Sequence, residues 1–397
     1  MTKELLIIAT LIFTLFSCGD KSFKSENNSS KSLQLASNDF SDSLNIPSTD
    51  SNASGLIIPT AKMQTPRADH SATLLKDGTV LVCGGFSGES NFSSSTEIYN
   101  PSSKTFTAVN NLNASRSAHS ATLLPDGKVL ICGGYNGNYL STIEIYDPQT
   151  KSFLPGPSMN TARSGHTATL LYNGKILFAG GVGIGWTFLS SAEIYDIQTN
   201  RFIPAGSMTV ARESHTATLL KNGNVLIAGG HRDRKQNVKI YASAEIYDIK
   251  SNTFIETGSM KIPRHKHDAV LLSDGKVMIN GGSDQRDSKG VYLSAEMYDP
   301  KTSQFVSLPN MNYPRYKHKG TTILLHDKNA FIGGGSDKAE IFDFKTETFY
   351  SLQGSMGTVR LFSCATMLDN GQVLITGGYD EDNRTSNGAW LYVDKRR

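Results

Sequence analysis

Residues 116–134 read RSAHSATLLPDGKVLICGG, and variants of this stretch recur along the 397-residue chain in seven copies. Each copy begins with an arginine, continues through two short β-prone runs and ends on consecutive glycines. The opening arginines are Arg67, Arg116, Arg163, Arg212, Arg264, Arg315 and Arg360, so neighbouring copies lie 45 to 52 residues apart. A period of roughly fifty residues predicts the blades of a β-propeller rather than the coils of a solenoid.

Each copy also contains the signals of an antiparallel sheet. In the second copy, the runs 120–124 and 128–132 flank Asp126-Gly127, and six of the seven copies carry Asp-Gly or Asn-Gly at this place. That dipeptide between β-prone runs predicts a hairpin with a type I′ turn. A third run follows at 143–147 and a fourth around Phe153. We therefore expect four antiparallel strands per copy, and radial stacking of seven such sheets covers their apolar faces.

The two ends of the repeat region complement each other. The last copy supplies only three runs between Arg360 and Tyr392, whereas residues 56–63 (LIIPTAKM) align with the fourth run at 202–208 (FIPAGSM). We expect the N-terminal strand to complete the last blade. The predicted fold is therefore an all-β, seven-bladed propeller over residues 56–397.

The repeat resembles a known family. The diglycine, the downstream tyrosine (Tyr146 in the second copy) and the outer aromatic (Phe153) resemble a kelch repeat, and the lead-in RSAHSATLL resembles its bacterial variety. Such propellers include galactose-oxidase-like copper enzymes and sugar epimerases or mutarotases. The resemblance to these enzymes concerns the fold only, because no residue of this sequence stands out as part of a catalytic pocket. We therefore predict no catalytic residue and no cofactor. A carbohydrate-active enzyme therefore stays an alternative to a binding module.

The N-terminal segment predicts an export signal. Residues 1–17 contain Lys3 followed by an apolar run from Leu5 to Phe16, which is too short to span a bilayer and typical of a signal peptide. The ending LFSC resembles a bacterial lipobox, which implies that Cys18 is lipidated. Residues 18–55 are rich in Ser and Asn and predict a flexible tether. We expect a lipid-anchored, monomeric protein of the bacterial cell envelope, with an ordinary secretory signal as the alternative.

Composition excludes some functions. The net charge of +3 gives no support to nucleic-acid binding. Three cysteines remain after Cys18, without metal-type spacing. Two of them, Cys83 and Cys132, occupy a repeat position that other copies fill with alanine, asparagine or threonine. This position indicates packing rather than redox chemistry.

The repeated Arg, His and Glu residues indicate structure rather than catalysis, because a catalytic group is needed once and not in every blade. Six copies carry the histidine, and copy seven replaces both the His and the strand Glu, by Ser363 and Trp390. The joint replacement suggests the hypothesis that His and Glu are partners.

Candidate ligand-binding residues come from the loops that the repeat does not fix, since loops on a rigid scaffold can vary without disturbing the fold. The lead-in and the loop after the second strand should emerge on one face. Copies one to three contribute aromatic residues there, and copies four to six contribute basic ones. The candidates are Trp186, Phe188, His231, Arg232, Arg234, Lys235, His265, Lys266, Arg286, Lys317 and Lys319.

This set predicts a site for an anionic ligand, either a glycan or a protein segment, flanked by stacking aromatics. The alternative is a solvated basic rim offset by Asp233, Asp284 and Asp287. His265 and His267 could also share a metal ion, but the sequence offers no clear third ligand. We therefore predict a membrane-anchored binding module outside the cytoplasm, with no metal or other cofactor.

Overall fold

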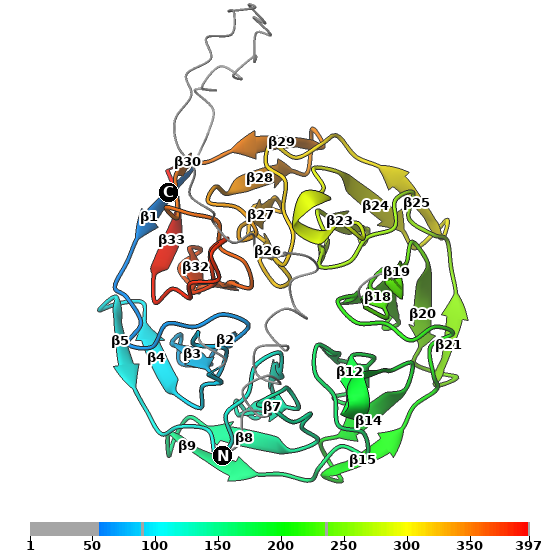
Figure 1. Cartoon of the computed structure of the whole chain (residues 1–397). Coiled ribbons are helices and arrows are strands. Elements are labelled where there is room, and N and C mark those ends of the chain that lie inside the picture. The colour runs from blue at the N-terminus through cyan, green and yellow to red at the C-terminus, as the bar shows by residue number, and fades with distance from the viewer. Residues whose placement is uncertain (1–54, 89–90, 235–236, 396–397) are drawn as a thin grey trace, which may run out of the picture.

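The computed structural model describes residues 55–88, 91–234 and 237–395, and these form seven four-stranded antiparallel sheets arranged in a ring (Figure 1). The predicted all-β propeller is confirmed. Cys18, the segment 1–17 and nearly all of the 18–55 tether lie outside the described residues, as does Lys235. Among the described residues, no helix is long and apolar enough to cross a membrane.

Blades one to six each use four consecutive main strands, with the first strand nearest the centre of the ring. Blade one comprises β2 (Ser71–Leu74), β3 (Val80–Cys83), β4 (Thr96–Asn100) and β5 (Thr105–Ala108), and blade two comprises β6 (Ser120–Leu123), β7 (Val129–Cys132), β8 (Ile143–Asp147) and β9 (Ser152–Pro155). Blade three comprises β10 (Thr167–Leu170), β11 (Ile176–Ala179), β14 (Ala192–Asp196) and β15 (Arg201–Pro204). Blade four comprises β16 (Thr216–Leu219), β17 (Val225–Ala228), β20 (Ala244–Asp248) and β21 (Thr253–Glu256). Blade five comprises β22 (Asp268–Leu271), β23 (Val277–Asn280), β24 (Ala295–Asp299) and β25 (Gln304–Ser307), and blade six comprises β26 (Thr322–Leu324), β27 (Ala330–Ile332), β28 (Glu340–Asp343) and β29 (Thr348–Ser351).

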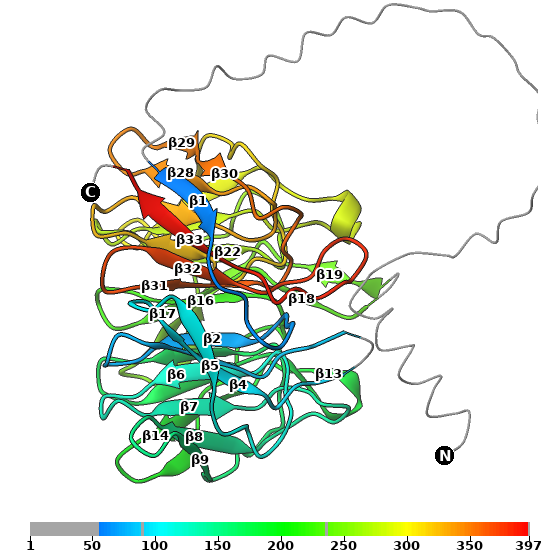
Figure 2. The same ribbon diagram turned by 90° about the vertical axis from the view of Figure 1, so that its left-hand side faces the viewer.

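Short extra elements follow the second strand in blades three to five. They are β12 (Val182–Gly183), η1 (Ile184–Trp186) and β13 (Thr187–Phe188) in blade three, β18 (His231–Arg232) and β19 (Lys239–Ile240) in blade four, and η3 (Asp287–Lys289) in blade five. Figure 2 shows β13, β18 and β19 projecting from one face of the ring, which we call the loop face.

The N-terminal strand closes the ring, as the sequence predicted. Blade seven contains β31 (Cys364–Met367), β32 (Val373–Thr376) and β33 (Ala389–Asp394). Its fourth strand is β1 (Gly55–Pro59), which pairs antiparallel with β33 over five residue pairs and parallel with β30 (Gln353–Gly354) of the preceding connection. Ile57 is 3% exposed and packs in the core between blades six and seven. The blade is therefore built from both ends of the described chain.

The predicted type I′ turn is wrong. In blade one, Leu75 donates its backbone N–H to Thr79 O at 2.8 Å, and Gly78 donates to Leu75 O at 3.0 Å. Only Gly78 has positive φ, at 79°. The loop is thus a three-residue turn ending in a glycine bulge, and Asp77 caps it by accepting the Thr79 N–H at 3.0 Å. Blade six keeps the same turn with Lys328 at a φ of 75°.

The hydrophobic core consists of layers between blades. Seven clusters of buried side chains occur, and each joins residues of two neighbouring blades, including one between blade seven and blade one. Cys83 and Cys132 are fully buried in two of these layers. Their burial confirms the packing interpretation of that repeat position.

Candidate functional site

A buried arginine–glutamate pair holds each of the first six blades. In blade two, Arg116 Nη2 donates to Glu144 Oε1 at 2.7 Å, and Nη1 donates to Gly133 O at 2.7 Å, with the arginine side chain 0% exposed. Glu144 also accepts the backbone N–H groups of Asn113 and Ala114, at 2.7 and 3.1 Å. The pair therefore fastens the lead-in loop to the second and third strands of its own blade, which makes these residues part of the scaffold.

The repeated histidines join neighbouring blades, so the hypothesis that they pair with glutamate is wrong. His119 Nε2 lies 2.9 Å from Ser71 Oγ, and His166 Nε2 lies 2.9 Å from Ser120 Oγ. Each hydroxyl belongs to the first strand of the preceding blade. Burial lowers the pKa of His166 well below its ordinary value, which keeps the imidazole neutral.

Blade seven replaces the ion pair by stacking. Among the residues that the structure describes, Arg360 has no glutamate partner, because Trp390 occupies that strand position. Its guanidinium carbon lies 5.0 Å from the centroid of the indole ring. Arg360 Nη2 also donates to Met356 O at 3.2 Å. A cation–π contact therefore stands where the other blades have a salt bridge.

Seven residues with left-handed backbone conformation form a ring at the mouth of the central channel. Each blade contributes one, which directly precedes the repeat histidine or, in blade seven, Ser363. Their φ angles lie between 50° and 65°. Backbone hydrogen bonds of 2.7 to 3.1 Å join six of the seven neighbouring positions. We call this set the mouth ring: Asp69, Ala118, Gly165, Ser214, Lys266, Lys317 and Phe362. The backbone is thus fixed while the side chains differ from blade to blade.

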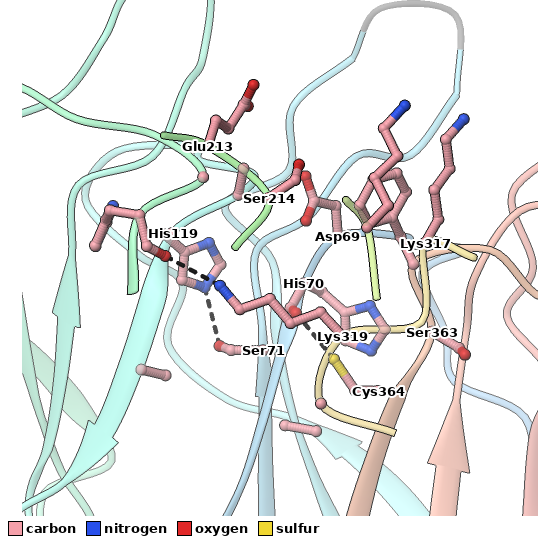
Figure 3. Close-up of a pocket in the computed structure, with 18 of the residues that line it drawn as sticks. Asp69, His70, Ser71, His119, Glu213, Ser214, Lys317, Lys319, Ser363 and Cys364 are labelled. Carbon is pink, nitrogen blue, oxygen red and sulfur yellow. Dashed lines mark hydrogen bonds between the residues drawn. The ribbon is translucent and has the colours of Figure 1, made fainter. Parts of the chain in front are cut away.

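A cavity of about 290 Å³ opens within the mouth ring (Figure 3). Its lining includes four cationic side chains, two carboxylic acids and several buried histidines. The cations are Arg234, Lys266, Lys317 and Lys319, and the acids are Asp69 and Glu213. Because the histidines are held neutral, the cavity carries an excess of positive charge.

Two lysines of the mouth ring converge on one carboxylate. Lys266 Nζ donates to Asp287 Oδ1 at 2.8 Å, and Lys317 Nζ lies 4.0 Å from Asp287 Oδ2. Lys317 also donates to the Tyr379 hydroxyl at 3.0 Å. The like charge of Lys317 adds to burial, the main cause, and the pKa of Lys266 falls to about 8. Asp287 therefore offsets part of the positive charge of these two lysines, as expected from the alternative interpretation of the basic residues as a rim balanced by aspartates.

Aromatic residues of blades one to three form the neighbouring wall. Ring centroids lie 5.4 Å apart for Phe92 and Tyr135, 5.0 Å for Tyr135 and Tyr139, and 5.7 Å for Tyr139 and Trp186. The Arg234 guanidinium carbon lies 5.1 Å from the Trp186 ring, and Arg234 Nη2 pairs with Glu213 Oε2 at 2.9 Å. Arg234 therefore joins this aromatic wall to the cationic side of the cavity.

Two further groups in the cavity have displaced pKa values. Burial raises the pKa of Asp69 to about 7, with Lys319 acting in the opposite direction. Burial likewise raises the pKa of the Cys364 thiol to about 12, and this thiol donates to His70 O at 3.0 Å. Asp69 can therefore exchange a proton near neutral pH, whereas Cys364 is a poor nucleophile.

The predicted site residues fall into three groups. His231, Arg234, Lys266, Lys317 and Lys319 line the cavity. Trp186 and Phe188 flank it through their contacts with Arg234.

The other predicted residues do not reach the cavity lining. Buried His265 lies behind His231, with their Nδ1 atoms 3.1 Å apart. Arg232 and Arg286 are on the outer rim, where Asp233 and Asp284 pair with them at 3.4 and 2.6 Å. Lys235 remains a prediction outside the described residues.

Sequence reasoning missed the two acids of the cavity. Asp69 and Glu213 occupy lead-in positions that differ between copies, and comparison of those positions alone could have found them. The suggested metal pair is wrong in its geometry, because His267 Nε2 contacts Thr216 Oγ1 at 3.1 Å while His265 contacts His231. Within the described ranges, no three His, Cys, Asp or Glu side chains converge as a metal site would require.

Comparison with known proteins agrees with the architecture. The KLHDC2/KLHL20/DRC7 Kelch-repeats domain family matches residues 155–335, and the Kelch motif matches 66–113 and 116–160. A putative F-box/kelch-repeat protein of Arabidopsis thaliana is 30% identical over 115 residues, which are 28% of this chain and 32% of that protein. The chain thus matches about a third of that relative's length.

A solved structure shares the fold. It is a novel fungal alcohol oxidase in complex with copper, with a TM-score of 0.70 and 17% identity over 86% of this chain and 76% of the other. At that identity the likeness shows the architecture alone. The family matches together with the seven radial sheets show that this chain belongs to the kelch-repeat β-propeller proteins.

Proposed function

We propose that this kelch propeller is a binding module that takes an acid-bearing glycan at the mouth of its channel. The observation that carries the proposal is the cavity itself, where four cationic side chains from blades four to six surround a space of about 290 Å³. A space of this size accommodates a single sugar residue. Its excess positive charge favours a carboxylate or sulfate on that sugar.

The aromatic wall supports a glycan in particular. Tyr139 and Trp186 lie beside the cationic side of the cavity and are only partly buried. Sugar rings present apolar C–H faces that pack on aromatic side chains, while their acidic groups need cations. A glycan that carries an acidic group therefore has an apolar face for the aromatic wall and a negative charge for the cationic side of the cavity.

A glycan array tests this proposal. Acid-bearing glycans should bind and their neutral counterparts should not, and binding should weaken as salt rises because the attraction is electrostatic. Lys319→Met should reduce binding, whereas Arg286→Gln on the outer rim should leave it unchanged. The proposal would be contradicted if no acid-bearing glycan bound, or if the binding of such glycans did not change with salt concentration.

We further propose that the module is anchored outside the cytoplasm through lipid on Cys18. The support is the sequence of residues 1–18, with its short apolar run and the LFSC ending. Metabolic labelling with an alkyne-bearing fatty acid should modify the wild-type chain and leave Cys18→Ser unmodified. Equal labelling of both, or labelling of neither, would contradict lipid anchoring.

A further inference from the structure

Blade six differs from the others at the start of its first strand. In blades one to five, the first strand begins directly after the repeat histidine, as in His267 followed by β22. In blade six, residues 319–321 stand between His318 and β26. The Asp268 carboxylate fixes this insertion by accepting the backbone N–H groups of Thr321 and Thr322, at 2.9 and 2.7 Å.

The insertion sends the Lys319 side chain across the channel. Its Nζ donates to the backbone oxygen of His166 in blade three at 3.2 Å (Figure 3). Lys319 also lines a second cavity of about 310 Å³, whose lining includes Ser120, Thr167 and Thr216. Lys319 therefore contributes to the lining of both cavities.

The Lys319 amine has no ion-pair partner among the described residues. Lys266 and Lys317 have Asp287 nearby and Arg234 has Glu213, but no described carboxylate lies within 4.0 Å of Lys319 Nζ. Enclosure by protein lowers the pKa of Lys319, although nearby carboxylates including Asp268 and Asp69 act in the opposite direction. Lys319 is open to the channel but surrounded by protein, and such a lysine holds more neutral amine near pH 7 than a lysine on the outer surface does.

We propose that Lys319 is a nucleophilic amine that captures an anionic aldehyde or 2-oxo acid as an imine. The inference rests on the proposed anion site for the acidic group of the ligand. Among the described blades, only blade six has this insertion, and the insertion positions the amine. Lys266, Lys317 and Arg234 attract the acidic group, and Lys319 takes the carbonyl carbon.

The chemistry balances without another reagent. The Nζ lone pair forms a C–N bond to the carbonyl carbon, and the carbonyl oxygen takes up a proton to give a carbinolamine. Loss of one N–H proton and of the hydroxyl group then forms the C=N bond and releases one water. Asp69 lines the same cavity as Lys319 and has a pKa of about 7, so we assign it the role of supplying and recovering these protons.

Reductive trapping with glyoxylate tests the inference on the full chain. Glyoxylate and borohydride should convert Lys319 to carboxymethyl-lysine at least about tenfold faster than exposed Lys104 and Lys151, as read by peptide mass spectrometry. Lys319 reacting no faster than these two lysines would overturn the inference.

The matched variant Lys319→Arg keeps a positive charge in the channel but cannot form the imine. It should still bind acidic glycans and should show no preferred trapping site in the cavity. Glycan binding without preferred trapping at Lys319 in the wild type would overturn the imine and leave the proposed function intact. Preferred trapping without any glycan binding would instead overturn the acidic-glycan function.

Discussion

Replacing the buried Arg116 by methionine should strongly destabilise the propeller. The guanidinium makes four hydrogen bonds, and the change leaves Glu144, 4% exposed, without its counter-charge. Removing one partner of a buried ion pair costs about 3–5 kcal/mol. The free energy of unfolding of Arg116→Met, measured by urea denaturation, should fall by that amount relative to wild type.

Blade seven provides the matched control for this change. Arg360 occupies the same repeat position, but it makes one hydrogen bond and stacks on Trp390. Loss of a cation–π contact and one hydrogen bond costs about 1–2 kcal/mol. Arg360→Met should therefore destabilise much less than Arg116→Met. Equal losses for the two variants would refute the argument that the arginine–glutamate pairs hold the blades.

Three other predictions follow from the scaffold and the cavity. Deleting residues 55–62 removes β1 and its Ile57 from the closing blade, and should lower the free energy of unfolding by more than about 3 kcal/mol in the same denaturation assay; an unchanged value would refute closure. In a Cys18→Ser chain, the buried Cys83 and Cys132 should react with a thiol reagent only on unfolding, whereas Cys364, which lines the cavity, should react slowly in the folded chain because its pKa is raised; rapid labelling of the folded chain would contradict this. The pKa of Asp69 is about 7 in the folded protein and about 4 in the unfolded chain, so the folded state binds the extra proton between these values. Stability should therefore fall as pH rises from about 4 to 7, and comparison of denaturation curves should show a smaller fall in Asp69→Asn; identical pH profiles would exclude the assigned pKa.

Sequence periodicity was sufficient to predict the ring. The fifty-residue period, the alternating β-prone runs and the complementary ends at 56–63 and 360–392 are local patterns, and local patterns specify strands and their closure. The turn type was missed because Asp77-Gly78 fits two hairpin loops, and strand register selects the three-residue one.

The hydrogen-bond partner of each repeated side chain was harder to predict from the sequence, because it depends on how strands and loops pack against one another. The sequence showed that His, Arg and Glu recur, but the histidine reaches a hydroxyl of the preceding blade while the arginine reaches the glutamate of its own. Copy seven changed His and Glu together, which suggested a contact that does not exist. Two residues that are replaced together in a single copy need not contact each other, because both can change when the packing of that blade differs from the others.

The sequence predicted the candidate residues as part of a loop surface, and the structure places five of them around a cavity. Basic residues of copies four to six were recognised from their types, yet Arg286 pairs on the rim whereas Lys319 crosses the channel. Arg286 lies in the loop after the second strand, whereas Lys319 lies between the repeat histidine and the first strand. Blade six is two residues longer there, since its arginine and the glycine that accepts from it are 19 residues apart instead of 17, and counting those residues in the sequence would have revealed it. Charge alone did not distinguish these two positions.

Calorimetric titration with the strongest acid-bearing glycan from the array, beside its neutral counterpart, tests the cavity most directly. Wild type should bind the acidic glycan and not the neutral one, Lys319→Met should weaken binding at least about tenfold, and Arg286→Gln should bind as wild type does. Equal affinity for the acidic and neutral glycans, or equal affinity of wild type and Lys319→Met, would contradict the assignment of the channel mouth as the binding site.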